Sequence, residues 1–154
     1  MKRAFIVLLI TVISLCASAP CCAVHRSDYK SLNLSDDDLL LISKAVCADA
    51  GNENYLIKAC VTSMLLNRIS DGFFPNDASS VIFENGALLF ADKETVEKIQ
   101  NDDALLEYTL LTKIIYEYGI DPSCGALFCF MDGDSDIEDF NVTIEIDGLV
   151  FAKP

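Results

Sequence analysis

The spacing of apolar positions changes once along this chain, from a helical period in its first two thirds to alternation near its end. Ser35 followed by Asp36-Asp37-Asp38 is typical of a helix start, because serine caps free amide groups and acids favour the positive helix end. The apolar positions after it predict a helix that Gly51-Asn52 ends. A second helical pattern covers residues 53–70 and stops at Asp71-Gly72.

Two short helices and one longer helix are predicted next, over residues 77–83, 92–100 and 103–118. Gly119 closes the longer helix, since glycine readily takes the left-handed conformation found after helix ends.

Near the end of the chain the period becomes two. Residues 126–131 form a β-rich run, and residues 132–139 form an acidic loop. Residues 142–152 alternate around Asp147-Gly148, a strong signal for a two-residue hairpin turn. Helices first and a small antiparallel sheet last predict one α+β domain over residues 35–154.

The first residues have the composition of a secretory signal peptide. A basic start at residues 1–3 precedes an apolar run at 4–15 and small residues up to Ala23. Cleavage after Ala23 is preferred to cleavage after Ala19, because Pro20 would follow the second cut. We therefore expect a signal peptide over residues 1–23, a flexible lead-in over 24–34, and a secreted, extracytoplasmic protein without a stable membrane anchor. A retained amphiphilic anchor is the alternative.

The net charge limits the possible binding partners, and the cysteine content leaves two possibilities for the thiols. The net charge of -13 repels phosphate groups, so we expect no nucleic-acid partner, and we expect a monomer. Four cysteines follow the signal peptide, and an even number in an exported chain permits disulfides. Burial as small apolar side chains is the equal alternative. The four are Cys47, Cys60, Cys124 and Cys129.

Several kinds of catalytic site can be set aside. The single histidine, His25, lies at the edge of the signal peptide, so we expect no histidine in the folded region and neither a serine triad nor a cysteine–histidine pair. The acidic run from Asp132 resembles a calcium loop but has Ile137 at its sixth position and Thr143 at its twelfth. The cysteine spacing does not suit zinc, and we expect no metal and no cofactor.

Carboxylates remain as candidates for chemistry. Asp49 lies late in the first helix between Ala48 and Ala50, whose small side chains would let a bulky substrate approach. Glu53 follows four residues later, so both acids would face one cleft if the helix continued or turned tightly. A carboxyl in a partly apolar cleft keeps its proton longer and can donate it to a leaving oxygen. The alternative is a capping or surface aspartate.

Five segments, in order, make the chain similar to a known family. They are ADAGNE at 48–53, LLNR at 65–68, FPNDASSVI at 74–82, GALFCF at 125–130 and IDGLVF at 146–151. Together they resemble the catalytic domain of the SleB/CwlJ type of spore cortex-lytic enzymes and related cell-wall hydrolases.

The resemblance implies a lysozyme-like, lytic-transglycosylase-like domain that is mainly helical with a small C-terminal antiparallel hairpin. It also implies cleavage of the glycan strands of peptidoglycan, by a glycosidase or a lytic transglycosylase with a single catalytic carboxyl. The catalytic acid of the family corresponds to Asp49, and its second acidic position corresponds to Glu53.

The chain departs from the family at two places. The catalytic glutamate is Asp49 here, which withdraws the carboxyl by about 1.5 Å, and a G-Q-F element is replaced by Gly86-Ala87-Leu88. The residues proposed to contact sugar are Tyr55, Asn67, Arg68, Phe128 and Phe130, although each aromatic fits the core equally well and Arg68 would also serve to pair with an acid. Two other functions stay open: an inactive relative that binds glycan or a protein partner, and an unrelated secreted acidic binding protein.

Overall fold

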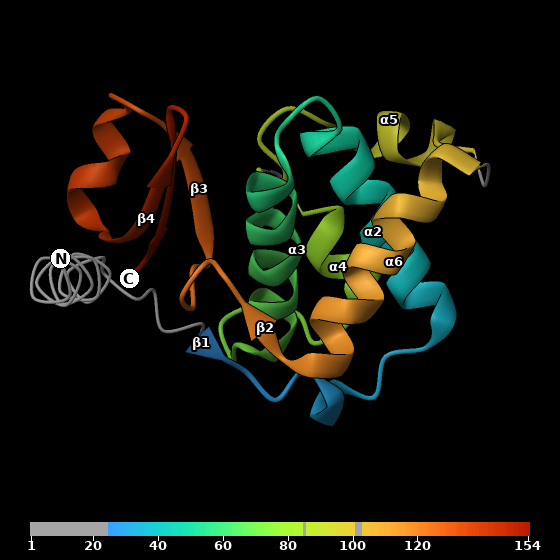
Figure 1. The fold of residues 1–154 in the computed structure, drawn as a ribbon. Helices are drawn as coiled ribbons and strands as arrows, with labels where there is room; N and C mark the ends of the chain where they lie inside the picture. Colours follow the sequence, from blue (N-terminus) through green and yellow to red (C-terminus); the bar gives the residue numbers. More distant parts are fainter. Residues whose placement is uncertain (1–24, 85, 101–102) are drawn as a thin grey trace, which may run out of the picture.

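A computed structural model describes residues 25–84, 86–100 and 103–154, and the signal peptide predicted at 1–23 lies outside them. Figure 1 shows a helical body with a small sheet at its side, next to α3. The helices of the body are α2 (Asp36–Ala50), α3 (Tyr55–Ser70), α4 (Ala78–Ile82), α5 (Lys93–Lys98) and α6 (Asp103–Tyr118). None of the helices in these ranges is long and apolar enough to cross a membrane.

The helix starts follow the capping residues in the sequence. Ser35 and Asp38 form a reciprocal capping box at the start of α2, with the Asp38 amide 3.1 Å from the Ser35 hydroxyl. The α3 helix begins two residues later than predicted, because the Asn54 side chain accepts the amide of Ile57 and so becomes the N-cap.

The segment before α2 is part of the folded domain. The strand β1 (His25–Arg26) pairs with β2 (Ile120–Asp121), and a 3₁₀ turn, η1 (Tyr29–Leu32), follows. Tyr29 is 1% exposed and belongs to the hydrophobic core. The prediction of a flexible lead-in is therefore wrong for residues 25–34, because a buried aromatic residue fixes this segment to α3.

Gly119 explains how that segment comes so close to the end of α6. It has a φ of +63°, and a Cβ at this position would collide with the Ser27 carbonyl. The Ser27 amide donates to the Gly119 carbonyl at 3.0 Å. Glycine is therefore required here both for its backbone conformation and for the close approach of two chain segments.

The C-terminal sheet lies where the alternating pattern of the sequence predicts strands. Its strands are β3 (Phe128–Met131), β4 (Asn141–Ile146) and β5 (Leu149–Lys153), in the order β3-β5-β4, and all pairs are antiparallel. Asp147 and Gly148 have φ values of +48° and +82°, as a type I′ hairpin turn requires. The predicted acidic loop contains a second 3₁₀ turn, η2 (Ser135–Asp139). The α+β class is confirmed.

Candidate active site

Asp49 lies at the C-terminal end of α2 with its side chain turned into the protein. The residue is 7% exposed. One carboxylate oxygen, Oδ1, accepts the backbone amides of Phe90 at 2.6 Å and Ala91 at 3.1 Å. Asp49 therefore holds the loop between α4 and α5 against the end of α2.

Burial changes the acidity of this group. Removal from water raises the pKa of Asp49 above its ordinary value, and this effect outweighs the amides of Phe90, Ala91 and Leu89 and the charge of Arg68, which lower it. A carboxyl with a raised pKa retains its proton at higher pH, which is the property that a general acid needs.

Glu53 lies in the turn between α2 and α3, so the two acids do not share one helix. A Cβ on Gly51 would collide with the Cys47 carbonyl, and the Glu53 amide donates to the Ala50 carbonyl at 3.0 Å. The chain thus turns tightly, the second of the two arrangements considered from the sequence. The Glu53 side chain is partly exposed and makes no recorded hydrogen bond or ion pair with the described residues.

Arg68 joins the Asp49 loop to the sheet from inside the protein. It is 3% exposed, and its guanidinium donates to the carbonyls of Ala87 at 2.7 Å and Leu127 at 2.5 Å. The rings of Phe74 and Phe128 lie 5.4 and 5.6 Å from its central carbon. Arg68 forms no ion pair within 4.0 Å among the described residues. Because two of its nitrogens donate to main-chain carbonyls, the structure favours a positioning role over sugar contact.

Asn67 is likewise engaged within the protein. Its oxygen accepts the Tyr29 hydroxyl at 2.7 Å, and its amide nitrogen donates to Ser123 Oγ at 3.2 Å and the Ala126 carbonyl at 3.1 Å. The proposed sugar contact at Asn67 therefore competes with hydrogen bonds that hold the first described segment and the residue 121–126 turn against α3.

Phe128 and Phe130 lie on one face of β3 in an aromatic cluster. Their ring centroids are 6.2 Å apart, and the Phe140 ring lies 4.7 Å from Phe128 and 5.1 Å from Phe130. The Phe74 ring is 5.9 Å from Phe128. Phe140 was not predicted, although the i, i+2 spacing of Phe128 and Phe130 indicated that one sheet face would be aromatic.

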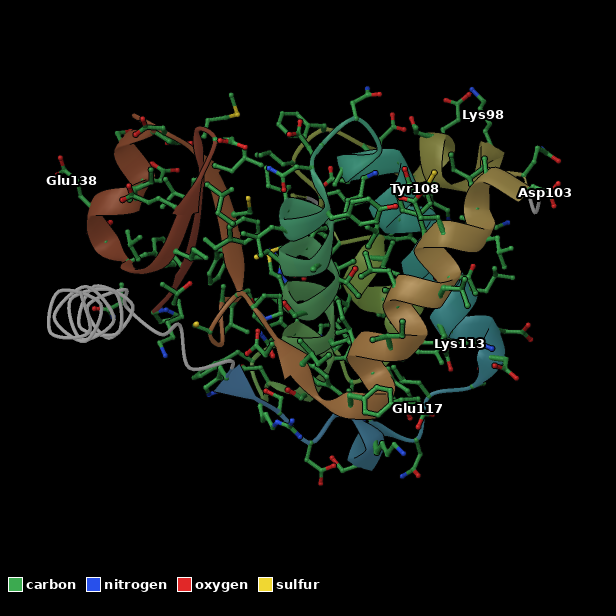
Figure 2. All side chains as sticks on the ribbon, viewed as in Figure 1. Lys98, Asp103, Tyr108, Lys113, Glu117 and Glu138 are labelled. Atoms are coloured by element: carbon green, nitrogen blue, oxygen red, sulfur yellow. The ribbon has the colours of Figure 1, made fainter. Side chains whose placement is uncertain are left out.

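Tyr55 is not brought together with the Asp49 group. It is 63% exposed and, with Leu106 and Leu110, lines a hollow of about 470 Å³ between α3 and α6. Tyr108, labelled in Figure 2 on α6, points toward the α2–α3 turn, where its hydroxyl donates to the Gly51 carbonyl at 3.2 Å. Tyr55 thus lies beside side chains of α6 and has no printed contact with Asp49.

The expectation that no histidine lies in the folded region is wrong. His25 Nδ1 lies 2.9 Å from Oδ2 of the fully buried Asp121. A serine is also present, but the Ser123 hydroxyl donates to Asp121 Oδ1 at 2.7 Å, whereas a catalytic triad needs the serine on the histidine. These three residues therefore fix the β1–β2 pair and do not form a nucleophilic site.

Burial sets the protonation state of two of the four cysteines that follow the predicted signal peptide. The four cysteines are thiols in the structure, and burial raises the pKa of Cys60 and Cys129 to about 12, which keeps them protonated and unreactive. Within the described ranges, no group of three or more His, Cys, Asp or Glu side chains suits a metal ion.

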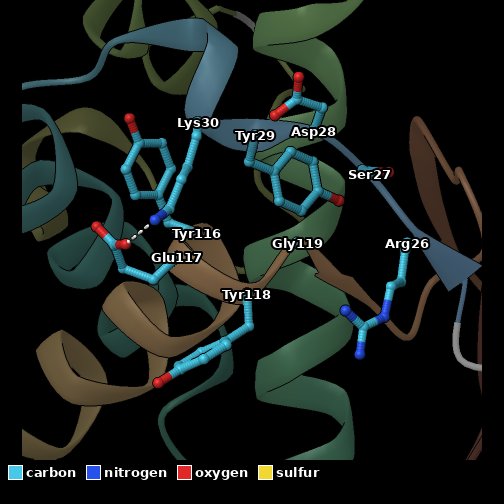
Figure 3. Close-up of a pocket in the computed structure, with 9 residues that line it drawn as sticks. All are labelled: Arg26, Ser27, Asp28, Tyr29, Lys30, Tyr116, Glu117, Tyr118 and Gly119. Atoms are coloured by element: carbon cyan, nitrogen blue, oxygen red, sulfur yellow. Dashed lines mark ion pairs between the residues drawn. The ribbon is translucent and has the colours of Figure 1, made fainter.

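A separate hollow of about 380 Å³ lies where the first described segment meets the end of α6 (Figure 3). An ion pair between Lys30 and Glu117, 2.6 Å long, crosses it, and Tyr118 and Arg26 stand on its rim. Its lining includes none of the residues predicted for catalysis or sugar contact.

Comparisons with known proteins define the class of this domain. No protein-family model matches the sequence. The crystal structure of the catalytic domain of the Bacillus cereus SleB protein has a TM-score of 0.63 and 26% identity, covering 77% of this chain and 91% of that chain. The catalytic domain of the germination-specific lytic transglycosylase SleB of Bacillus anthracis has a TM-score of 0.52 and 27% identity, covering 78% and 97%. The chain therefore has the lysozyme-like fold of these catalytic domains.

Sequence comparison finds relatives of the same kind as the structural comparison. A spore cortex-lytic enzyme of Halalkalibacterium halodurans is 32% identical over 107 residues, 70% of this chain and 31% of that protein. One from Bacillus cereus is 32% identical over 96 residues, 62% and 35% of the two lengths. The chain spans about a third of the length of these curated relatives. It is a divergent relative of the spore cortex-lytic enzymes.

Proposed function

We propose that this chain cleaves the glycan strands of peptidoglycan, as a glycosidase or a lytic transglycosylase, with Asp49 as the proton donor. The observation that carries the proposal is the fold, which accounts for 91% and 97% of two SleB catalytic domains. The names of the relatives give the substrate class, and the raised pKa of Asp49 fits the role of the acid.

The proton would move in two steps. Protonated Asp49 gives its proton to the oxygen that bridges two sugars, and the bond from that oxygen to the anomeric carbon breaks. The amides of Phe90 and Ala91 then stabilise the carboxylate that remains, from fixed positions that need no rearrangement. The oxygen of water in hydrolysis, or of the sugar's own 6-hydroxyl in transglycosylation, then bonds to the anomeric carbon, and the proton that this group loses returns to the Asp49 carboxylate. Glu53, at the adjacent turn, is proposed as the assisting acid.

The same proposal places the protein outside the cytoplasm, because peptidoglycan is the substrate. The signal peptide proposed for residues 1–23 would deliver it there, to the cell wall or the spore. A role in spore germination follows from the names of the relatives and is part of this proposal.

A specific observation favours a second function, an inactive relative that binds glycan or a protein partner. The Asp49 side chain is one methylene shorter than that of glutamate, and the residue is only 7% exposed. A misplacement of about 1 Å can cost on the order of 100-fold in rate. The two functions differ only in turnover, so an activity measurement separates them.

The test is a zymogram against spore cortex and vegetative peptidoglycan. Wild type should clear the substrate, Asp49→Asn should not, and Asp49→Glu should clear it faster. Asp37→Asn, an exposed aspartate at the opposite end of α2, is the matched control and should retain activity. Products with 1,6-anhydro ends would indicate transglycosylation, and reducing ends would indicate hydrolysis. Clearing by Asp49→Asn would show that Asp49 is not the acid.

A further inference from the structure

Exposed apolar side chains follow the outer face of α6. Leu106, Leu110, Ile114 and Tyr118 recur every four residues and are between 48% and 67% exposed. We call these four residues the α6 ridge, because side chains at i and i+4 form a raised row along a helix. Single exposed apolar residues are common, but a continuous row of them marks an interaction surface.

The opposite side of α6 is apolar as well. Leu105, Tyr108 and Ile115 are buried there and belong to the hydrophobic core. Since each residue turns the helix by about 100°, the α6 ridge points away from these three residues. A helix that is apolar on all sides is normally covered on all sides. The α6 ridge therefore indicates a partner on the outer side of this helix.

Hollows follow one another beside the α6 ridge. One of about 470 Å³ is lined by Leu106, Leu110 and Ile114, and one of about 280 Å³ is lined by Leu110, Ile114 and Tyr118. Tyr118 also lines the hollow of about 380 Å³ shown in Figure 3. From Leu106 to Tyr118 the ridge is about 18 Å long, which is the length of about three turns of a second helix.

The charges beside the α6 ridge favour a basic partner. Three lysines there already pair with acids of the same chain, in the pairs Lys58–Glu107, Lys113–Asp36 and Lys30–Glu117. Asp103, which lines the hollow of about 470 Å³, forms no ion pair within 4.0 Å among the described residues. Figure 2 shows Asp103 at the start of α6, with Glu117 near the other end. The net charge of -13 repels a second copy of the chain and an anionic membrane, whereas it attracts a cationic surface.

We propose that the α6 ridge docks a basic amphipathic helix of a partner protein. The ridge packs between rows of apolar side chains on that helix, as ridges pack into grooves between helices. A lysine or arginine at the edge of the apolar face of the partner helix meets Asp103, and this complementary charge selects the partner. Neither Asp49 nor its hydrogen-bond partners Phe90 and Ala91 line these hollows, so docking goes beyond the proposed cleavage and does not depend on it.

The experiment uses three fluorescent peptides of about 16 residues, the length of α6. The first carries leucine along one helix face and lysine elsewhere, and the second has glutamate in place of lysine. The third has the composition of the first, with its leucines scattered around the helix. Fluorescence anisotropy measures the binding of each peptide to the wild-type protein. We expect the first peptide to bind about tenfold more tightly than either of the others, and its affinity should fall as the salt concentration rises.

Variants then locate the contact. Leu110→Gln combined with Ile114→Gln should weaken binding of the first peptide about tenfold, and Asp103→Asn should weaken it about threefold. Met131→Gln and Val142→Gln, at exposed apolar positions of the C-terminal sheet, are the matched controls and should bind as wild type does.

NMR of the wild-type protein provides a readout that does not depend on the folding of variants. The first peptide should shift amide signals of residues 106–118. Equal binding of the first and third peptides, unchanged binding by the Leu110→Gln and Ile114→Gln double variant, or shifts confined to residues outside α6 would overturn the inference.

Two other ways of covering the α6 ridge are tested in parallel. Analytical ultracentrifugation measures self-association, and co-sedimentation with phosphatidylglycerol vesicles measures binding to an anionic membrane. A dimer or vesicle binding that the double variant abolishes would overturn the proposal of a basic partner, whereas a monomer that ignores vesicles supports it. Asp49→Asn should bind the first peptide as wild type does, so a loss of cleavage and a loss of docking are distinguished.

Discussion

Replacing Asp49 by asparagine should remove activity without removing stability. The asparagine oxygen can still accept the amides of Phe90 and Ala91, which Asp49 holds at 2.6 and 3.1 Å. What the substitution removes is a carboxyl whose charge is disfavoured by burial, since desolvation raises the pKa of Asp49. Natural active sites often trade stability for such a group.

The direction of the pKa shift of Asp49 determines how the stability of wild type changes with pH. The pKa of Asp49 is higher in the folded protein than its ordinary value of 3.8, so the folded state binds more protons above that pH. Wild type therefore loses stability as the pH rises from about 3.8 through the raised pKa, and Asp49→Asn does not. Each pKa unit is worth about 1.4 kcal/mol, so the stability of the variant relative to wild type should increase with pH by an amount that measures the shift.

Urea unfolding followed by circular dichroism at pH 5 to 8 tests this prediction. Asp49→Asn should be at least as stable as wild type at pH 7. Asp49→Ala leaves two buried amides without an acceptor and should lose about 2–4 kcal/mol at pH 5. The reasoning is refuted if Asp49→Asn and Asp49→Ala are destabilised equally, or if the stability of Asp49→Asn relative to wild type declines as the pH rises.

Three further substitutions test the supports of the site, each by the midpoint of urea unfolding. Tyr29→Phe removes the hydroxyl that donates to the buried Asn67 and should cost about 1–2 kcal/mol. The control Tyr118→Phe, at an exposed position, should cost little. Equal losses would contradict the Tyr29–Asn67 hydrogen bond. Arg68→Lys replaces the Nε and Nη1 donors by one compact ammonium that does not match the positions of both carbonyls, and should cost about 2–4 kcal/mol. A loss below about 0.5 kcal/mol would argue against a supporting role for these two hydrogen bonds. Gly148→Ala, at a φ of +82°, should cost about 1–2 kcal/mol. The control Gly72→Ala, which has open space around it, should cost less. Equal losses in the two variants would argue against the left-handed conformation of Gly148 in the hairpin turn.

Local chemistry made much of the fold predictable. The Ser35 cap and the Asp147-Gly148 turn each act over a few residues, so their geometry is contained in the sequence around them. The start of α3 was misplaced by two residues because Asn54, a stronger cap than Glu53, lies at the next position.

Contacts between distant residues were not predictable in this way. Tyr29 meets Asn67, which is 38 residues away, and His25 meets Asp121, which is 96 residues away. A polar segment beside a predicted signal peptide gives no local sign that one of its aromatic residues will be buried. The same applies to Asn67 and Arg68, whose polar side chains suggested a binding cleft until their partners at residues 121–127 were known.

The two departures expected from the family resemblance are linked through one loop, which carries residues 86–88 and also bonds Asp49. The segment 86–88 that replaces G-Q-F leads directly into Phe90 and Ala91, whose amides hold the shortened acid, while Ala87 accepts from Arg68. A longer glutamate would move the carboxyl about 1.5 Å relative to these donors, and a polar residue in the loop would change where they lie. The acid and the loop are thus joined by hydrogen bonds, so Asp49→Glu alone tests the reach of the carboxyl, and Asp49→Glu combined with Ala87→Gln and Leu88→Phe tests whether the loop limits cleavage.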